Sequence, residues 1–204
     1  MTTPARDLAD PRRASLVRQA RSHFIAKGYA GARMEPIARA AGVSTATLYI
    51  FFSSKAVLFE AVIEEIAEEF SRQTTAVPVA TGAPRDRLVE ILDAYAVFMS
   101  DGFVHTVFGL IMEKHDRCSA IAAAIFEHGR RDFGAVLMTV LAEMTQAGQL
   151  SVSRPSWTTG QLMGMIEHPL FSLPLTGGRE AAADRSPRQI AEDAVDVILA
   201  RYGV

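Results

Sequence analysis

The chain has 204 residues, of which 49% are hydrophobic and 22% are charged, so its composition fits a folded globular protein and excludes a disordered polyelectrolyte. Its one cysteine, Cys118, excludes an intrachain disulfide framework and the usual multi-cysteine zinc site. The net charge of −2 hides an asymmetry, because residues 1–55 hold nine Lys and Arg against three Asp and Glu, whereas the remainder holds 12 against 20. Such a basic N-terminal part favours a protein that binds nucleic acid at one end, although a solvated charged surface has the same balance.

No apolar stretch approaches the roughly 20 residues that a membrane-spanning helix needs. The first ten residues, Met1–Asp10, are polar and lack the apolar centre of a signal peptide. The sequence therefore predicts a cytoplasmic protein with no membrane partner, and no motif in it calls for a cofactor or a metal.

Apolar residues recur at helical spacing between Gly and Pro breaks, which predicts an all-α chain of about nine helices. Asp10 is expected to cap a first helix that begins at Pro11 and stops at Gly28. Two short helices follow, over Met34–Ala41 and, after a cap at Ser44, over Thr45–Phe51.

Ser54 is expected to cap a long fourth helix, and a loop follows over Thr74–Pro84. The later helices are expected near Arg85–Ser100, Val104–Lys114, Ser119–Ala147, Ser156–Ser172 and, after a cap at Ser186, Arg188–Ala200. Pro169 predicts a kink or an early end in the fourth of these. The resulting organisation is a flexible tail over 1–10, a small three-helix domain over 11–55 and a larger helical domain over 56–204.

The segment from Gly28 to Lys55 has the pattern of a helix-turn-helix, in which two short helices are separated by a turn at Gly42-Val43. In such a motif the first helix holds the second, and the second enters the major groove of DNA. The inner side chains are expected to be Ile37, Ala38, Ala41, Val43, Leu48 and Phe52. The outer face is left to Thr45, Thr47, Tyr49 and Ile50.

This segment resembles the TetR family of bacterial regulators in a long ordered string of residues. The matching residues are Gly28-Tyr29, Met34-x-x-Ile37-Ala38, Ala41-Gly42-Val43-Ser44, Thr47-Leu48-Tyr49, Phe52, Ser54-Lys55 and Leu58-Phe59. The resemblance implies a homodimer that binds a palindromic operator in double-stranded DNA, most often as a repressor and sometimes as an activator. It also implies that the larger domain binds a small-molecule effector and forms the dimer.

Carried over residue by residue, the resemblance places Ser44, Thr45 and Thr47 at the groove and Tyr49 on a phosphate. Lys55, in the first turn of the fourth helix, is expected to hold a phosphate together with the free N–H groups there. The structural alternatives are that Tyr49 packs half-buried and that Lys55 is an ordinary solvated lysine.

Two positions depart from the family pattern. Arg33 stands where the family usually has a Thr or Ser cap, so the second helix loses a cap and gains a cation that can reach a phosphate. Ile50 replaces a residue that is often polar; it can contact a thymine methyl group but cannot hydrogen-bond a base edge. An unusual operator sequence is therefore expected, unless Ile50 fills a gap in the small domain.

In this family the last two helices of each subunit form a four-helix bundle, which would set two recognition helices about 34–36 Å apart. The apolar residues expected at that dimer interface are Leu162, Met165, Ile166, Pro169, Leu170, Val195, Ile198 and Leu199. The alternative is that they complete the subunit's own core.

The larger domain is rich in Phe and Met, which suits a pocket for a largely apolar effector but is also common in an ordinary core. The candidate pocket residues are Phe98, Met99, Phe103, Phe108, Met112, His115, Phe126, Phe133, Trp157 and Met163.

Two other classes of protein are compatible with parts of the sequence. An all-helical enzyme would need Glu113, His115 and Asp116, or Glu127 and His128 with Asp132, to converge. Neither set has a metal-binding helix spacing, and no nucleophile elbow or phosphate loop is present. A non-specific architectural DNA binder would spread positive charge over the chain, which the acidic remainder argues against. We therefore expect a regulator and not an enzyme.

Overall fold

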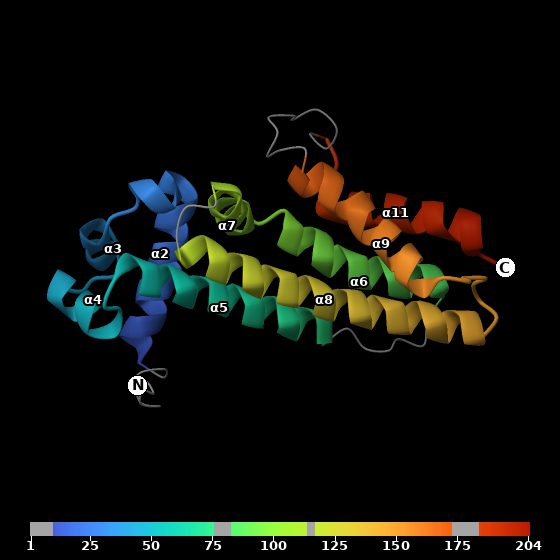
Figure 1. The fold of residues 1–204 in the computed structure, drawn as a ribbon, viewed down its shortest axis with the longest axis horizontal. Helices are drawn as coiled ribbons and strands as arrows, with labels where there is room; N and C mark the ends of the chain where they lie inside the picture. Colours follow the sequence, from blue (N-terminus) through green and yellow to red (C-terminus); the bar gives the residue numbers. More distant parts are fainter. Residues whose placement is uncertain (1–9, 76–82, 114–116, 173–183) are drawn as a thin grey trace. The chain divides into compact units, whose positions relative to one another are not determined.

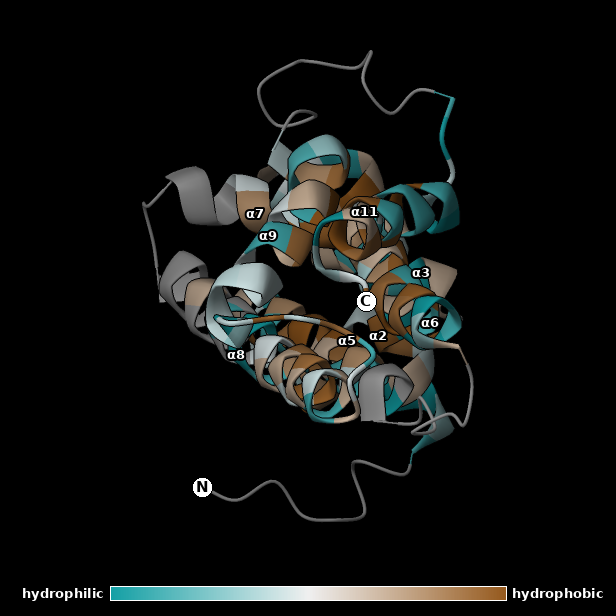
Figure 2. Ribbon diagram, turned by 90° about the vertical axis from the view of Figure 1, so that its right-hand side faces the viewer, coloured by the Kyte–Doolittle hydropathy of each residue, from teal (hydrophilic) through white to brown (hydrophobic). Residues whose placement is uncertain are grey.

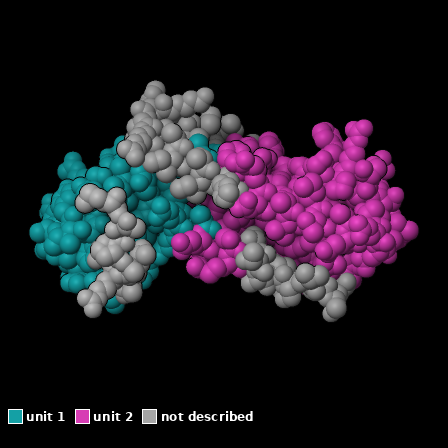
Figure 3. Space-filling view, turned by 60° about the horizontal axis from the view of Figure 1, so that its bottom comes forward, with its two compact units in different colours: residues 1–67, 106–125 teal, residues 68–105, 126–204 magenta. Residues whose placement is uncertain are grey.

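The computed structural model describes residues 10–75, 83–113, 117–172 and 184–204. Within these ranges the chain forms nine α-helices and one π-helical turn, which confirms the predicted all-α class. The chain divides into two compact units, one of residues 1–67 and 106–125 and the other of residues 68–105 and 126–204 (Figure 3). The predicted boundary at residue 55 differs from this division, because the first unit continues along the next helix.

The first unit contains the predicted helix-turn-helix (Figure 1). Its helices are α2 (Pro11–Gly31), α3 (Met34–Ala40), α4 (Thr45–Phe51) and the first part of α5 (Lys55–Thr75). Asp10 Oδ1 accepts a hydrogen bond from the N–H of Arg12 at 2.8 Å, so the predicted cap of α2 is present. Gly28 has φ 66° and interrupts α2, as its place at the end of the apolar stripe predicts.

Aromatic and aliphatic side chains from α2, α4 and α5 form the core of the first unit. Phe24 and Tyr29 of α2 each lie edge-on to Phe59 of α5, with 4.9 Å between ring centroids in both pairs. Leu16 and Leu48 are completely buried. Burial of side chains of this size contributes roughly 1.5–3 kcal/mol each, so the short helices are held by packing rather than by their own helix propensity.

The second unit is built of helices that each bury a stripe of mostly apolar side chains. Its elements are α6 (Pro84–Met99), the first residues of α7 (Gly102–Glu113), most of α8 (Arg117–Gln146), α9 (Pro155–Glu167), the π-helical turn η1 (His168–Ser172) and α11 (Pro187–Tyr202). Figure 2 shows that α11 carries hydrophilic and hydrophobic residues on different sides. Its buried residues Ile190, Ala194 and Ile198 repeat every four positions, as an amphipathic helix requires.

The ends of α9 and α11 follow local signals in the sequence. The α-helical geometry of α9 ends at Glu167 and a π-helical turn containing Pro169 follows, which confirms the predicted break. Ser186 caps α11 in a reciprocal capping box with Gln189. Two ion pairs, Arg85–Asp196 at 2.7 Å and Arg188–Asp93 at 3.2 Å, join α11 to α6.

Among the described residues, no single helix is both long and apolar enough to cross a membrane. The pair Thr45–Phe51 and Lys55–Arg72 passes the same test on length and composition, but the two helices are bent by 63°.

Candidate nucleic-acid interface

The turn between α3 and α4 is closed by backbone hydrogen bonds and by one glycine. Gly42 has φ 73°, a left-handed conformation that a side chain would strain. The N–H of Val43 donates to the carbonyl oxygen of Ala38 at 3.0 Å, and the N–H of Gly42 donates to that of Arg39 at 3.1 Å. Ile37 of α3 and Leu48 of α4 are both completely buried and fix the two helices to the core. The sequence-predicted geometry of the motif is therefore present.

The start of α4 is held by two hydroxyl groups. The N–H of Thr47 donates to Ser44 Oγ at 3.0 Å, and the two side-chain oxygens lie 2.8 Å apart in a further hydrogen bond. Ser44 is thus the N-cap that the sequence predicts. Its hydroxyl and that of Thr47 are exposed or half-exposed and already oriented, which limits the entropy lost when a partner binds them.

The remaining outer residues of α4 take no part in the core. Tyr49 is 49% exposed and Ile50 is 81% exposed. An isoleucine with that exposure fills no gap in the small unit, so the structural alternative for Ile50 does not hold. Its side chain therefore adds little burial to the fold and is accessible to a molecule outside the chain.

Arg33 occupies the N-cap position of α3 and makes no capping hydrogen bond with its side chain, as its departure from the family pattern predicts. The residue is exposed. Glu35 in the first turn is the acidic residue nearest the helix N-terminus, where the macrodipole favours negative charge.

Lys55 has different partners from the phosphate that the sequence analysis predicts. Its ammonium nitrogen donates to the backbone carbonyl oxygens of Tyr29 at 2.8 Å, Ala30 at 3.3 Å and Ala32 at 3.2 Å. It also lies 4.6 Å from the centroid of the Tyr29 ring, a cation–π distance. An ammonium has three N–H donors, so all of them are used at the end of α2. Lys55 therefore joins the end of α2 to the start of α5.

Two arginines that the sequence analysis did not select lie against the far end of α4. The guanidinium of Arg12 lies 5.7 Å from the ring centroid of Phe51, and that of Arg13 lies 5.3 Å from that of Phe52. Arg12 is also paired with Asp10 at 2.7 Å, and this hydrogen-bonded cation lowers the pKa of the Asp10 carboxyl. The basic run after Pro11 was visible in the sequence, but its approach to α4 depends on how α2 packs.

In the second unit, several of the predicted effector residues belong to one aromatic cluster. Phe98 is stacked on Phe70 with 4.2 Å between centroids, and Phe133 is stacked on Tyr95 at 4.3 Å. Phe70 and Phe133 lie 5.8 Å apart, which links the two stacks. Four of the candidate residues in this unit are buried: Met99, Phe103, Phe133 and Met163.

A polar group borders this aromatic cluster. Glu167 accepts hydrogen bonds from the hydroxyl of Tyr95 and from Arg130, whose Nε lies 2.8 Å away. Burial and the neighbouring Glu167 carboxylate raise the pKa of Tyr95. Among the described residues, Thr159 Oγ1 is the buried side-chain oxygen that has no hydrogen-bond partner. Sequence reasoning selected none of these four residues, because their chemistry depends on helices that meet only in the fold.

The other effector candidates divide into three groups. Phe108 is half-exposed and belongs to the first unit, so it stands apart from the cluster above. Trp157 is 65% exposed on α9, which contradicts its predicted place in an enclosed pocket. His115 lies outside the described residues, as do the side chains of Met112 and Phe126.

The predicted dimer residues are mostly buried inside the single chain. Leu162, Ile166 and Val195 are completely buried, and Ile198 and Leu170 are 2% and 8% exposed. Leu162, Ile166 and Val195 have no free surface to offer a partner and belong to the subunit's own core, whereas Leu170 keeps a small part of its surface and Ile198 lines the groove described next. Met165, Pro169 and Leu199 keep part of their surface.

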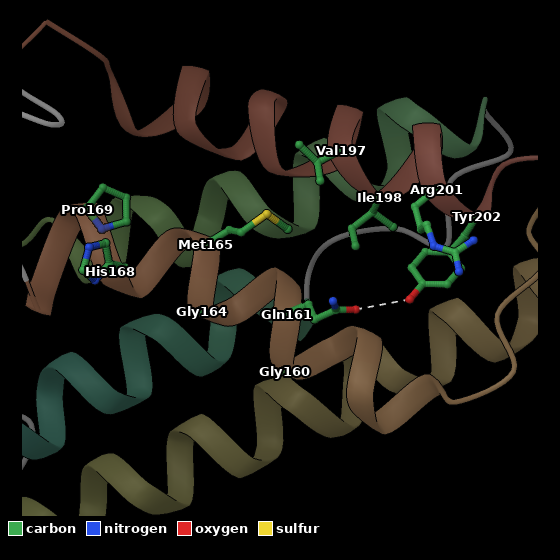
Figure 4. A pocket seen from close by; sticks show the side chains of 10 residues that line it. All are labelled: Gly160, Gln161, Gly164, Met165, His168, Pro169, Val197, Ile198, Arg201 and Tyr202. Atoms are coloured by element: carbon green, nitrogen blue, oxygen red, sulfur yellow. Dashed lines mark hydrogen bonds between the residues drawn. The ribbon is translucent and has the colours of Figure 1, made fainter.

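The outward side of α9 and α11 carries a groove (Figure 4). Its volume is about 730 Å³, and its lining comes from one stripe of each helix. On α9 the stripe includes Gly160 and Gly164, and His168 of η1 continues it; on α11 it includes Val197 and Arg201. Tyr202 donates a hydrogen bond to Gln161 Oε1 at 3.3 Å across the groove.

Two family models match the chain. Residues 16–62 match the model described as bacterial regulatory proteins of the tetR family, and residues 86–204 match the AefR-like transcriptional repressor C-terminal domain. A curated relative, the uncharacterized HTH-type transcriptional regulator YdgC of Bacillus subtilis strain 168, is 23% identical over 195 residues, with 94% of this chain and 92% of the relative covered.

Solved structures match along nearly the whole chain. A TetR-family regulator from Mesorhizobium loti MAFF303099 is 25% identical, with a TM-score of 0.73 and full coverage of both chains. The flavonoid-responsive regulator FrrA is 24% identical, with a TM-score of 0.63 and coverage of 94% of this chain and 97% of its own.

Proposed function

Because the chain belongs to the TetR family of bacterial regulatory proteins, we propose that it binds a palindromic operator in double-stranded DNA as a repressor and leaves it when an effector binds. DNA binding by a helix-turn-helix is the family's activity. The observation that carries the proposal for this chain is that α4 exposes Tyr49 and Ile50 while Leu48 anchors the same helix in the core. The repressor mode is supported by the description of the C-terminal family model.

The proposed DNA contacts follow the exposed face of α3 and α4. Ser44, Thr45 and Thr47 face base edges at the start of α4, and Ile50 packs against a thymine methyl group. Tyr49 and Arg33 bind phosphates on either side of the groove. Lys55 contributes by holding α2 to α5, since its ammonium already binds three carbonyl oxygens.

We place the dimer contact on the outward face of α9 and α11. That face offers Met165 and Pro169 from the sequence-predicted set and adds the groove between the two helices. A two-fold axis makes this an isologous interface, so the operator half-sites repeat with the same symmetry.

The proposed effector is small and largely apolar, and it binds in the second unit. The aromatic cluster of Phe70, Tyr95, Phe98 and Phe133 favours a planar molecule, and the unpartnered hydroxyl of Thr159 offers it one hydrogen bond. FrrA is a flavonoid-responsive protein, which makes flavonoids a reasonable first set of probes. The effector acts by favouring a state of the dimer that binds DNA weakly.

The proposal is tested by selecting bound sequences from a random DNA pool with the purified protein. The expected result is an enriched palindrome. Ile50→Ala should change the base preference at one position in each half-site, at a cost of about 1–3 kcal/mol for the preferred base. Tyr49→Phe, which removes one hydroxyl group, should weaken binding to all sequences alike.

Ile25→Ala is the matched control, because Ile25 is an exposed apolar residue (46%) on α2 and away from the α4 face. It should leave both affinity and base preference unchanged. Binding by the wild-type protein without any enriched sequence would contradict the proposal, and so would a preference that survives in every α4 variant.

A further inference from the structure

Trp157 is the single tryptophan of the chain, and 65% of it is exposed to solvent. It lies in the first turn of α9, on the opposite side from the buried residues Leu162 and Ile166. A tryptophan that makes full contact buries about 150–250 Å², which is more than almost any other side chain can offer. Tryptophan is also among the residues that most often carry the binding energy of protein interfaces.

Trp157 lies one helical turn before Gly160, the first residue of α9 that lines the α9–α11 groove. Residues at spacings of three and four share one face of a helix, so Trp157, Gly160 and Gly164 form a stripe along α9, which His168 continues at the start of η1. A Cβ atom added at Gly160 or Gly164 meets no atom within 4 Å. The two glycines therefore leave the floor of the groove open to a side chain from outside, at the position seen in Figure 4.

The face of α11 that carries Val197 and Arg201 of the groove, with Asp193 one turn before them, is self-complementary in charge. On α11, Asp193, Val197 and Arg201 repeat every four residues, so one face runs from acidic through apolar to basic. Val197 is 56% exposed, and all three lie on the surface, with Asp193 also paired to Arg185 at 2.9 Å. When a second copy packs antiparallel, its Asp193 comes opposite Arg201, whereas a parallel contact brings like charges together.

We propose that Trp157 of each subunit inserts into the α9–α11 groove of the other subunit and is the principal contact of the dimer. This inference rests on the proposed dimer and names the side chain that forms it. A two-fold axis makes the insertion reciprocal, so two indoles and two grooves are buried together. The partner's indole then fills the open space over Gly160 and Gly164, and the exposed apolar surfaces of Trp157 and Val197 are buried when the dimer forms.

The single tryptophan makes the test direct. Fluorescence of the full-length wild-type protein is measured over a dilution series, with acrylamide as quencher, beside sedimentation analysis of the same samples. In the dimer the emission should be blue-shifted and protected from acrylamide, and both properties should be lost at the concentration where the dimer dissociates. Trp157→Ala should raise the dimer dissociation constant about tenfold or more, as truncation of a central interface tryptophan does.

Gly164→Leu tests the groove from the other side, because leucine suits a helix and occupies the space that the indole needs. It should weaken the dimer by a similar factor while the protein stays folded. Met138→Ala, at a 37% exposed apolar residue of α8, is the control that should not change the dissociation constant.

Three results overturn the inference. A dimer whose Trp157 stays fully accessible to acrylamide, or whose dissociation constant is the same in Trp157→Ala, rules out insertion while the proposed dimer stands. A blue-shifted emission that stays unchanged while sedimentation shows the dimer dissociating means that the indole packs on its own chain. A wild-type protein that is monomeric at every concentration rules out both insertion and the proposed dimer.

Discussion

Helices α4 and α9 both carry residues that are proposed to meet a partner, but they differ in how those residues can be recognised. On α4 the residues selected from the sequence are the exposed ones, with Ile50 81% exposed beside a completely buried Leu48. On α9 three of the apolar residues selected from the sequence, Leu162, Met163 and Ile166, are buried, whereas Trp157 and Met165 keep surface beside the exposed glycines.

The difference teaches that an apolar stripe identifies the face that packs on the chain's own core. On a seven-residue helix such as α4, that stripe is so short that the outer face is obvious. On a longer amphipathic helix, the partner-binding face is the mixed one opposite the stripe, where small residues admit close approach and single large residues are left in water. Four experiments, from the largest expected effect to the smallest, test the assignments in the two regions.

The largest effect is expected at the buried stripe of α9. Ile166→Ala should lower the free energy of unfolding by about 2–5 kcal/mol, because it leaves a cavity at a residue with no exposed surface. Met165→Ala, next to it on the half-exposed side, should change the same quantity by less than about 1 kcal/mol. Urea unfolding at several protein concentrations measures both. A milder effect at Ile166 than at Met165 would reverse the assignment of the two faces.

Lys55→Met should lower the free energy of unfolding by about 1.5–3 kcal/mol, since three carbonyl oxygens lose a charged donor. DNA affinity should fall, but the slope of its logarithm against the logarithm of salt concentration should stay unchanged. Arg33→Met is the matched variant and should reduce that slope by about 0.9 per half-site, as the loss of one phosphate contact does. A loss of slope in Lys55→Met would instead place its ammonium on DNA.

Tyr95 should make the protein sensitive to alkali. Burial and the adjacent Glu167 carboxylate raise its pKa in the folded state, whereas in the unfolded chain it ionises near pH 10. Above that pH the unfolded state binds fewer protons than the folded state, so stability falls as pH rises, by about 1.4 kcal/mol per pH unit. Unfolding measured from pH 9 to 11 should show this slope in the wild type and a shallower one in Tyr95→Phe. Equal slopes would mean that Tyr95 ionises freely in the fold.

Ser44→Ala should have the smallest effect, about 1 kcal/mol, through loss of the cap on Thr47. Ser53→Ala, at an exposed serine one residue before Ser54, is expected to be neutral. Thermal unfolding compares the two. Identical melting temperatures for both variants would show that the Ser44 cap does not stabilise α4.

The sequence by itself determined where helices begin, end and break, because these features depend on residues close together in the chain. The caps at Asp10, Ser44 and Ser186, the left-handed glycines at Gly28 and Gly42, and the break near Pro169 all act within a few residues. Their effect is therefore the same in any fold that contains those helices. The order and number of helices, and the helix-turn-helix with its anchors, follow from these signals and the apolar periodicity.

Only the tertiary structure decided which partner each long side chain meets. The Lys55 ammonium donates to carbonyl oxygens of residues that lie 23 to 26 positions earlier in the chain. The Tyr95 hydroxyl donates a hydrogen bond to Glu167, which lies 72 positions later. Trp157 is exposed, although its large aromatic side chain made it a candidate for the effector pocket. Periodicity reports the two faces of a helix but not what covers each one, because that depends on the packing of helices distant in sequence.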